Sequence, residues 1–212
     1  LEPGLDADTA LTAAIRLPQD GVGNCRQFAH LLKAHAQEHG ASFRFGIEVL
    51  SIAAGSKVDL STRPMGTTEA PSGQSFDAVV VCAGHQAGHL LVPLGLHLPL
   101  LPVYGYALTA PVRQVEAMPD IGPRSGLMDE RYKIAVSRLG QRIRVAGGAE
   151  VGGRADRMDP AALRTLYKVL HDWFPGAADL SRAQHWKGAY PMLPDGPPVI
   201  GPSATAGVWI NV

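Results

Sequence analysis

The chain has 212 residues, of which 46% are hydrophobic, so it is long enough for one large domain or two small domains with real cores. Its 19 Lys and Arg residues balance 19 Asp and Glu residues at a pI near 7.3. This balance excludes a broad electrostatic footprint for nucleic acid or for an anionic membrane and favours small uncharged or zwitterionic ligands.

Cysteine usage and hydropathy indicate a reduced, cytoplasmic chain. Cys25 and Cys82 are far apart and form neither a CxxC pair nor a metal-type spacing. The longest apolar run, residues 90–101, is interrupted by proline and glycine, which excludes a transmembrane helix, and no signal peptide opens the chain. Because the chain begins at Leu1 without an initiator methionine, we expect a piece of a longer protein.

Helical periodicity predicts a first helix over residues 24–39. Asn24 can cap its start and Gly40 can end it. Its apolar positions recur at helical spacing, at Phe28, Leu31, Leu32 and Ala36.

Runs rich in β-branched and aromatic residues then predict three strands, over residues 42–45, 48–52 and 57–60. Residues 62–74 are dense in Pro, Gly, Ser and Thr and predict a loop between hairpin arms. Residues 76–84 are apolar on both faces, which is typical of a buried, central, parallel strand, and a helix is expected from there to Leu91.

Beyond Pro102 the strands lengthen and alternate. Residues 103–109, 132–138 and 141–146 suit an antiparallel sheet with one wet face. An amphipathic helix is predicted over residues 160–173, with Asp159 as its cap. Three short tail strands are expected at residues 183–186, 197–201 and 207–211. The fold class is α+β, with a mixed or antiparallel sheet.

The sequence holds no complete catalytic or nucleotide motif. The run Gly21-Val22-Gly23 lacks a third glycine and follows no strand, so it is better explained as a loop than as a dinucleotide fingerprint. His85 and His89 are four apart, but no third ligand lies nearby, and two surface histidines are the preferred interpretation over a metal pair. No GxSxG nucleophile elbow occurs. We therefore predict no metal site and name no catalytic base.

Some polar residues are candidates for ligand contact. Tyr132 and Arg138 are six apart on a predicted strand, so both would face one side and could line a pocket for a small carboxylate. They can equally well be polar residues on the solvent-exposed face of a sheet that have no function, and Lys133 and Arg144 are similarly ambiguous. The turn Pro194-Asp195-Gly196 exposes backbone amides that can hold an anionic or carbonyl-rich ligand, although its spacing alone indicates only a turn.

Six phrases occur here in the order found in bacterial D-amino-acid dehydrogenases, and the resemblance spans nearly all 212 residues. The phrases are IRLPQDGVGNC at 15–25, GYALT at 105–109, DERYKIA at 129–135, RIRVAG at 142–147, WKG at 186–188 and PDG at 194–196. The chain thus resembles part of an FAD enzyme of the D-amino-acid oxidase superfamily, in which the flavin carries the chemistry and the protein positions the substrate.

This resemblance implies a division of labour along the chain. Residues 1–101 and 191–212 would belong to a partial FAD-binding α/β domain, and residues 102–190 to an antiparallel-sheet substrate domain. The backbone of Val49 would touch the adenine side of FAD. The strand end Cys82-Ala83-Gly84 would lie against the nucleotide, the turn Pro194-Asp195-Gly196 would approach the flavin, and the sheet with Tyr132 would form the substrate pocket.

The sequence departs from the family pattern in ways that affect both ligands. The family's opening glycine fingerprint and its final flavin-capping segment are absent from the sequence. Where many relatives have an arginine that clamps the substrate carboxylate, this chain has Tyr190, which cannot supply a bidentate charged fork. Either another cation, such as Arg138 or Arg144, binds the carboxylate of a D-amino acid, or the substrate is not an ordinary D-amino acid but a related small amine.

The expected function is FAD-dependent oxidation of a substrate C–N bond by the longer parent protein. We expect the chain alone to be inactive and not to retain FAD. The alternatives are a non-catalytic ligand- or partner-binding remnant and one half of a split flavoenzyme. The expected partners are the small-molecule substrate and a second copy or a missing flavin-binding half, with no nucleic acid. Contact of the full protein with the cytoplasmic side of the inner membrane stays open.

Overall fold

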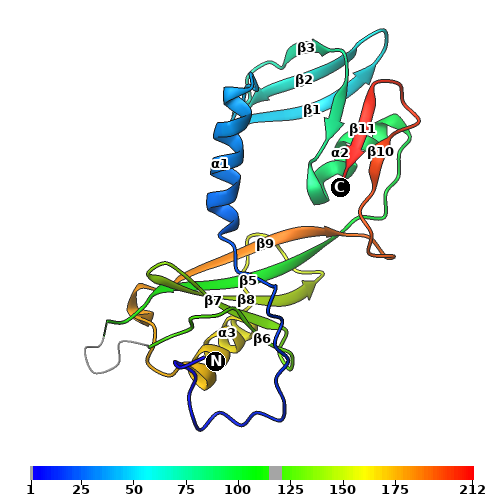
Figure 1. The fold of residues 1–212 in the computed structure, drawn as a ribbon. Helices are drawn as coiled ribbons and strands as arrows, with labels where there is room; N and C mark the ends of the chain where they lie inside the picture. The colour runs from blue at the N-terminus through cyan, green and yellow to red at the C-terminus, as the bar shows by residue number, and fades with distance from the viewer. Residues whose placement is uncertain (1, 115–120) are drawn as a thin grey trace. The chain divides into compact units, whose positions relative to one another are not determined.

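The computed structural model describes residues 2–114 and 121–212 (Figure 1). The chain divides into two compact units. Unit 1 consists of Leu1–His35 and Tyr104–Gly188, and unit 2 consists of Ala36–Val103 and Ala189–Val212. Residues 1–35 thus group with the sheet of unit 1, whereas the sequence assigned them to one domain with the residues up to 101. The assignment of flavin and substrate roles to these segments stays a prediction.

Unit 1 is built on a five-stranded sheet in the order β6-β7-β8-β5-β9. The strands are β5 (Leu101–Pro111), β6 (Leu127–Asp129), β7 (Ile134–Leu139), β8 (Arg142–Val151) and β9 (Gln184–Met192). β6, β7 and β8 pair antiparallel in sequence order. The first residues of β5 and the last residues of β9 belong to unit 2.

Helix α3 (Pro160–Trp173) packs against β7 and β8 of this sheet (Figure 1). Leu166, Val169 and Leu170 of the helix are buried, as are Ile143 and Val145 of β8. The start of the helix is fixed locally, because the Asp159 carboxylate accepts a hydrogen bond from the Ala161 backbone N–H at 2.9 Å and Pro160 occupies the first turn. The predicted helix and its cap are confirmed. The short 3₁₀ helix η3 (Leu180–Arg182) follows before β9.

Unit 2 contains two three-stranded sheets. The first is antiparallel, with β1 (Ile47–Ala54), β2 (Val58–Pro64) and β3 (Ser72–Phe76) in sequence order. The second has the order β10-β11-β4, where β4 (Val79–Val81) pairs parallel with β11 (Val208–Asn211) and β10 (Ile200–Pro202) pairs antiparallel with it.

A single apolar cluster joins the two sheets of unit 2 to helix α2 (Ala87–Leu91). Its buried residues are Ile52, Val58, Val81, Ala87, Leu91, Val208 and Ile210. The 3₁₀ turns η1 (Gly84–Gln86) and η2 (Val92–Leu94) flank α2. The cluster fixes the end of β4 and the residues that follow it, because α2 begins only a few residues after that strand ends.

Helix α1 (Cys25–Glu38) confirms the first predicted helix. The Asn24 side chain accepts a hydrogen bond from the Gln27 backbone N–H at 3.2 Å, and Gly40 has the positive φ of 89° that ends a helix. No described side chain of α1 is buried, and Phe28 and Leu31 are about two-thirds exposed.

The α+β fold class is confirmed, but several predicted strands have different limits. Residues 42–45 form no strand. The predicted loop 62–74 is shorter, because β2 continues to Pro64 and β3 begins at Ser72. The predicted buried strand 76–84 is reduced to β4, an edge strand with Val80 58% exposed. The interpretation of that strand as central and buried on both faces is wrong in this structure.

Candidate functional site

The end of β4 forms the first part of the candidate site. Cys82 is exposed, and Gly84 adopts the left-handed backbone with φ of 55° that allows the chain to turn into η1. A Cβ placed on Gly84 would lie 3.9 Å from Cδ of Pro191. The strand end Cys82-Ala83-Gly84 therefore lies beside the start of the segment that leads to Pro194-Asp195-Gly196, all within unit 2.

The Pro194-Asp195-Gly196 segment is a tight turn, as its sequence predicts. The Gly196 backbone N–H donates to the Leu193 carbonyl at 3.1 Å, and Gly196 has a φ of 88° that favours glycine. No heavy atom lies within 4 Å of a Cβ placed on Gly196. The turn thus presents backbone to open space on that side.

Val49 lies on β1, an edge strand of the first sheet of unit 2, and is partly exposed. It pairs with Thr62, and the register shifts between Val49 and Ser51, so Leu50 is an extra residue in the ladder. An edge position and a bulge both leave backbone groups available to a ligand.

The residues of unit 2 fit a nucleotide cofactor on structural grounds. In α/β sheets ligands bind outside the carboxyl ends of parallel strands, and β4 ends in a left-handed glycine beside a rigid turn. A side chain on Gly84 or Gly196 would narrow the approach to these backbones. Contact of FAD with Val49, Cys82, Ala83, Gly84, Pro194, Asp195 and Gly196 stays a prediction from the sequence.

Tyr132 does not lie on β7, contrary to its predicted place. Residues 130–133 form a turn that ends at Lys133, which has a positive φ of 54°. The Tyr132 ring lies against cations, with Arg131 at 5.2 Å and Lys168 of α3 at 5.8 Å from its centroid. The premise that Tyr132 and Arg138 face one side of a common strand is therefore wrong.

Arg138 and Arg144 lie on adjacent strands but differ in environment. Arg138 pairs with the buried Ile143 in the β7–β8 register, and its Nε donates to the Gly140 carbonyl at 2.9 Å, so it stabilises its own hairpin turn. Arg144 pairs with Ser137 and alternates with the buried Ile143 and Val145, which places it on the opposite sheet face.

Tyr190 is 43% exposed and belongs to unit 2, whereas Tyr132, Arg138 and Arg144 belong to unit 1. Within unit 1 the structure brings the three sequence candidates into no common cluster. Arg144 is the one whose guanidinium is not engaged by another part of the described chain.

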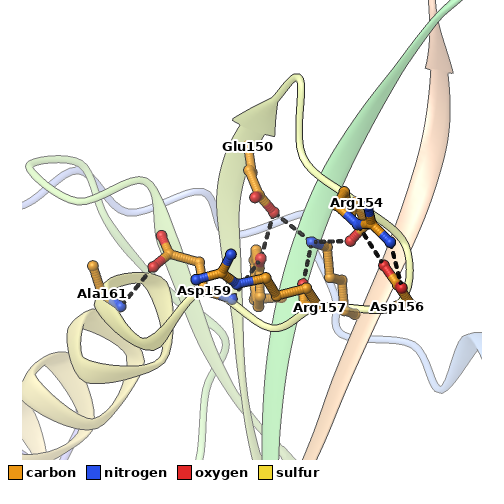
Figure 2. Close-up of polar contacts among 8 residues, drawn as sticks. Glu150, Arg154, Asp156, Arg157, Asp159 and Ala161 are labelled. Atoms are coloured by element: carbon orange, nitrogen blue, oxygen red, sulfur yellow. Dashed lines mark hydrogen bonds and ion pairs between the residues drawn. The ribbon is translucent and has the colours of Figure 1, made fainter.

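A buried ion pair that the sequence analysis missed lies on the β8–β5–β9 part of the sheet. The Lys187 side chain is 3% exposed, and its Nζ lies 2.6 Å from Oε2 of Glu150. The Tyr106 hydroxyl also donates to Glu150, in a short hydrogen bond. Figure 2 shows dashed lines from Glu150 to its two partners, one of which also bonds to the loop of Arg154 and Arg157. Only the phrase Trp186-Lys187-Gly188 pointed to this lysine, and without a role.

The Glu150 pair is electrostatically stabilised on both sides. Hydrogen bonds from Lys187 and then Tyr106 hold the pKa of the Glu150 carboxyl below its ordinary value of 4.5. Burial opposes the charge of Lys187, but its contacts with Glu150 and then Tyr106 outweigh burial and raise the pKa of the lysine above its ordinary value of 10.5. Both groups are therefore charged at neutral pH.

In residues 2–114 and 121–212, no group of three or more His, Cys, Asp or Glu side chains has a geometry that could hold a metal ion. Across the same described ranges, no helix is both long enough and apolar enough to span a membrane.

Solved structures with a similar fold include a glycine oxidase and an L-proline dehydrogenase. Glycine oxidase from Geobacillus kaustophilus superposes with a TM-score of 0.69 at 21% identity, covering 86% of this chain and 46% of that one. L-proline dehydrogenase from P. horikoshii gives a TM-score of 0.68 at 17% identity, covering 88% of this chain and 49% of the other. At these identities the likeness shows the fold.

The family model for DAO, described as FAD dependent oxidoreductase, matches residues 1–212, so the chain belongs to the DAO family of FAD-dependent oxidoreductases. The chain is 45% identical to a D-amino acid dehydrogenase from Cereibacter sphaeroides, over 99% of this chain and 46% of the relative. It is 39% identical to one from Bradyrhizobium diazoefficiens, over 100% of this chain and 48% of the relative. The chain thus spans about half the length of the curated relatives it matches.

Proposed function

We propose that the chain is part of an FAD-dependent dehydrogenase that oxidises the C–N bond of a D-amino acid or a related small amine. The main support for this proposal is the 45% identity, over 99% of the chain, to a relative named D-amino acid dehydrogenase. The approach of Gly84 to Pro191 supports it, because it brings two segments proposed to touch FAD together.

The proposed reaction is a two-electron oxidation that breaks the α-carbon C–H bond of the substrate and forms a C=N bond. When bound, FAD supplies the acceptor for the hydride that leaves the substrate α-carbon. The amine enters the step deprotonated, and its nitrogen lone pair forms the C=N bond as the hydride leaves. Water then converts the imino acid into a keto acid and ammonia. Because the α-hydrogen leaves as a hydride, no protein base needs to act on the α-carbon.

The residues of this chain would bind and orient the substrate. The Arg144 guanidinium is the cation we propose for the substrate carboxylate. Tyr190 belongs to unit 2 and stays a separate candidate from the sequence. Tyr132 and Arg138 are weaker candidates, because each already contacts its own surroundings. We place the protein in the cytoplasm.

The test uses the full-length parent protein. Its purified form should show a flavin absorbance band, which D-alanine or another D-amino acid should bleach without oxygen while the L-enantiomer leaves it unchanged. Bleaching by the L-enantiomer alone, or a full-length protein that binds no flavin, would overturn the proposal. Residues 1–212 alone should stay colourless with added FAD, because their sequence has no complete glycine fingerprint opening a helix.

A further inference from the structure

Residues 152–159, here called the strap, connect β8 to α3 across the edge of the unit 1 sheet. The strap begins with Gly152, whose φ is 74°, and Gly153, and it ends at Asp159, the cap of α3. Arg154, Asp156 and Arg157 are exposed. Two glycines at one end allow a backbone rotation that other residues would resist, while the helix cap fixes the other end.

Two side chains from the sheet tie the strap backbone down. Lys187 of β9 donates to the carbonyls of Arg154 and Arg157, at 2.7 Å each. The hydroxyl of Tyr106 of β5 accepts from the Asp159 backbone N–H at 3.1 Å. These bonds join side chains to backbone, so they do not depend on the identity of the strap side chains.

Lys187 is the centre of this arrangement. Its ammonium has three N–H donors, and the Glu150 carboxylate and two strap carbonyls are three acceptors. It also lies 4.4 Å from the ring centroid of Tyr104 and 5.2 Å from that of Tyr106. Because the lysine is buried, removing Glu150 or neutralising it would leave the ammonium with a missing partner.

Three acidic and three basic side chains lie in and around the strap, so their formal charges cancel. Glu150, Asp156 and Asp159 carry the negative charges, and Lys187, Arg154 and Arg157 the positive ones. Asp156 is bound to Arg154 through two hydrogen bonds at 3.0 and 2.8 Å, which belong to the strap itself (Figure 2). The Glu150–Lys187 pair therefore joins β8 to β9, and Lys187 connects this pair to the strap backbone.

We propose that the strap is a hinged lid and that the Lys187–Glu150 pair is its latch. With the latch formed, Glu150, the strap and Pro160 enclose a surface hollow of about 280 Å³. Loss of Lys187 removes the donor to the carbonyls of Arg154 and Arg157, and loss of the Glu150 charge removes the partner that holds the Lys187 ammonium beside them. In either case the strap swings about Gly152 and Gly153 and the hollow loses one wall. This device does not depend on the proposed enzymatic function.

The strap carries its own reporter, because an arginine-specific protease cuts after Arg154 and Arg157 only when the strap opens. In the Lys187→Met variant, cleavage at these two sites should be roughly tenfold faster or more than in the unmodified chain, since local opening governs such cleavage. The matched control is Lys168→Met, which removes the exposed ion pair with Asp172 on α3 and should leave strap cleavage unchanged.

If Lys187→Met fails to fold, the Glu150→Gln variant tests whether the Lys187–Glu150 pair holds the strap closed. This variant keeps the shape of the side chain and removes its charge, and strap cleavage should again accelerate while cleavage after Arg26 in α1 keeps its rate. A folded Glu150→Gln or Lys187→Met variant with unchanged cleavage after Arg154 and Arg157 would overturn the proposal. Cleavage of the unmodified strap as fast as that of an unfolded peptide would overturn it too.

Discussion

The Trp173 indole N–H donates to Oδ2 of Asp129 at 3.0 Å, which joins the last residue of α3 to the end of β6. The other oxygen of Asp129 accepts the backbone N–H groups of Arg131 at 2.9 Å and Tyr132 at 3.0 Å. Asp129 is itself buried, at 8% exposed. One carboxylate thus shapes the turn that keeps Tyr132 out of β7.

Asp129→Asn should destabilise the protein, because an amide has only one acceptor oxygen. Its NH₂ group would then face either the Trp173 indole N–H or the two backbone N–H donors. The expected loss of unfolding free energy is about 1–3 kcal/mol, measured by urea unfolding. Glu130→Gln at the neighbouring exposed position should change it by less than about 0.5 kcal/mol. Equal stability of the two variants would show that the Asp129 contacts contribute nothing.

Sequence signals predicted those elements whose causes are local. The bounds of α3 follow from Asp159, Pro160 and the spacing of Leu163, Leu166 and Leu170, all within one segment. The helical spacing of the apolar residues of α1 predicted this helix correctly for the same reason. The same spacing also predicts a buried face, but Phe28 and Leu31 are exposed, because burial depends on a distant surface that periodicity does not specify.

Sequence reasoning failed where the deciding contact is distant. Residues 42–45 have strand composition but no partner strand, and Val80 has an apolar neighbourhood in sequence but an edge position in space. Tyr132 was assigned to a strand because the left-handed backbone of Lys133 is not visible in a run of strand-forming residues. Lys187 reaches Glu150 and the strap across more than 25 residues of chain, so no local spacing could pair them.

Leu91→Ala should strongly destabilise unit 2, whereas Leu31→Ala should not. Leu91 is fully buried in the cluster of unit 2, and its truncation should cost about 2–5 kcal/mol of unfolding free energy. Leu31 is exposed on α1, and the same truncation should cost less than about 0.5 kcal/mol. Thermal or urea unfolding of both variants measures this, and a large loss for Leu31→Ala would mean that α1 is covered in solution.

Gly147→Ala should destabilise the β7–β8 pair through a steric clash. A Cβ on Gly147 would overlap the Lys133 carbonyl oxygen and lie 2.9 Å from Cα of Ile134, and backbone atoms cannot move aside cheaply. We expect a loss of about 1–3 kcal/mol or more in urea unfolding. Gly73→Ala is the control, because no heavy atom lies within 4 Å of its Cβ position on β3. A neutral Gly147→Ala variant would mean that the two strands are farther apart than described.

The strap should open in acid. The pKa of Glu150 is lowered by Lys187 and Tyr106, so its stabilisation is fully present above the ordinary value of 4.5 and is lost as the pH falls through the lowered pKa. Lys187 has a raised pKa and stays charged throughout this range. Asp156 also has a lowered pKa, due first to Arg154, but that pair lies within the strap.

The readout is hydrogen exchange at the Asp159 amide, divided by exchange at the buried Leu166 amide of α3 in the same sample, which cancels the intrinsic effect of pH. This ratio should be flat above the ordinary carboxyl value of 4.5 and rise only as the pH falls below it, through the lowered pKa of Glu150. In Glu150→Gln it should already be high at neutral pH and vary little. An exchange ratio in the unmodified chain that is as high at neutral pH as in Glu150→Gln would contradict the role of Glu150.

Arg144→Gln in the full-length enzyme tests the proposed substrate contact. If the Arg144 guanidinium binds the substrate carboxylate, its loss removes a charge-assisted hydrogen bond worth about 1.5–3 kcal/mol, so KM for the D-amino acid should rise roughly 10-fold to 100-fold. The flavin band should stay, because Arg144 lies in unit 1 and the proposed FAD contacts lie in unit 2. Arg138→Gln is the matched control, since Arg138 bonds to its own hairpin turn, and its KM should change less than about twofold. If Arg138→Gln raises KM and Arg144→Gln does not, the carboxylate is bound on the other face of the sheet, and Arg144 is a wet-face residue without a part in catalysis.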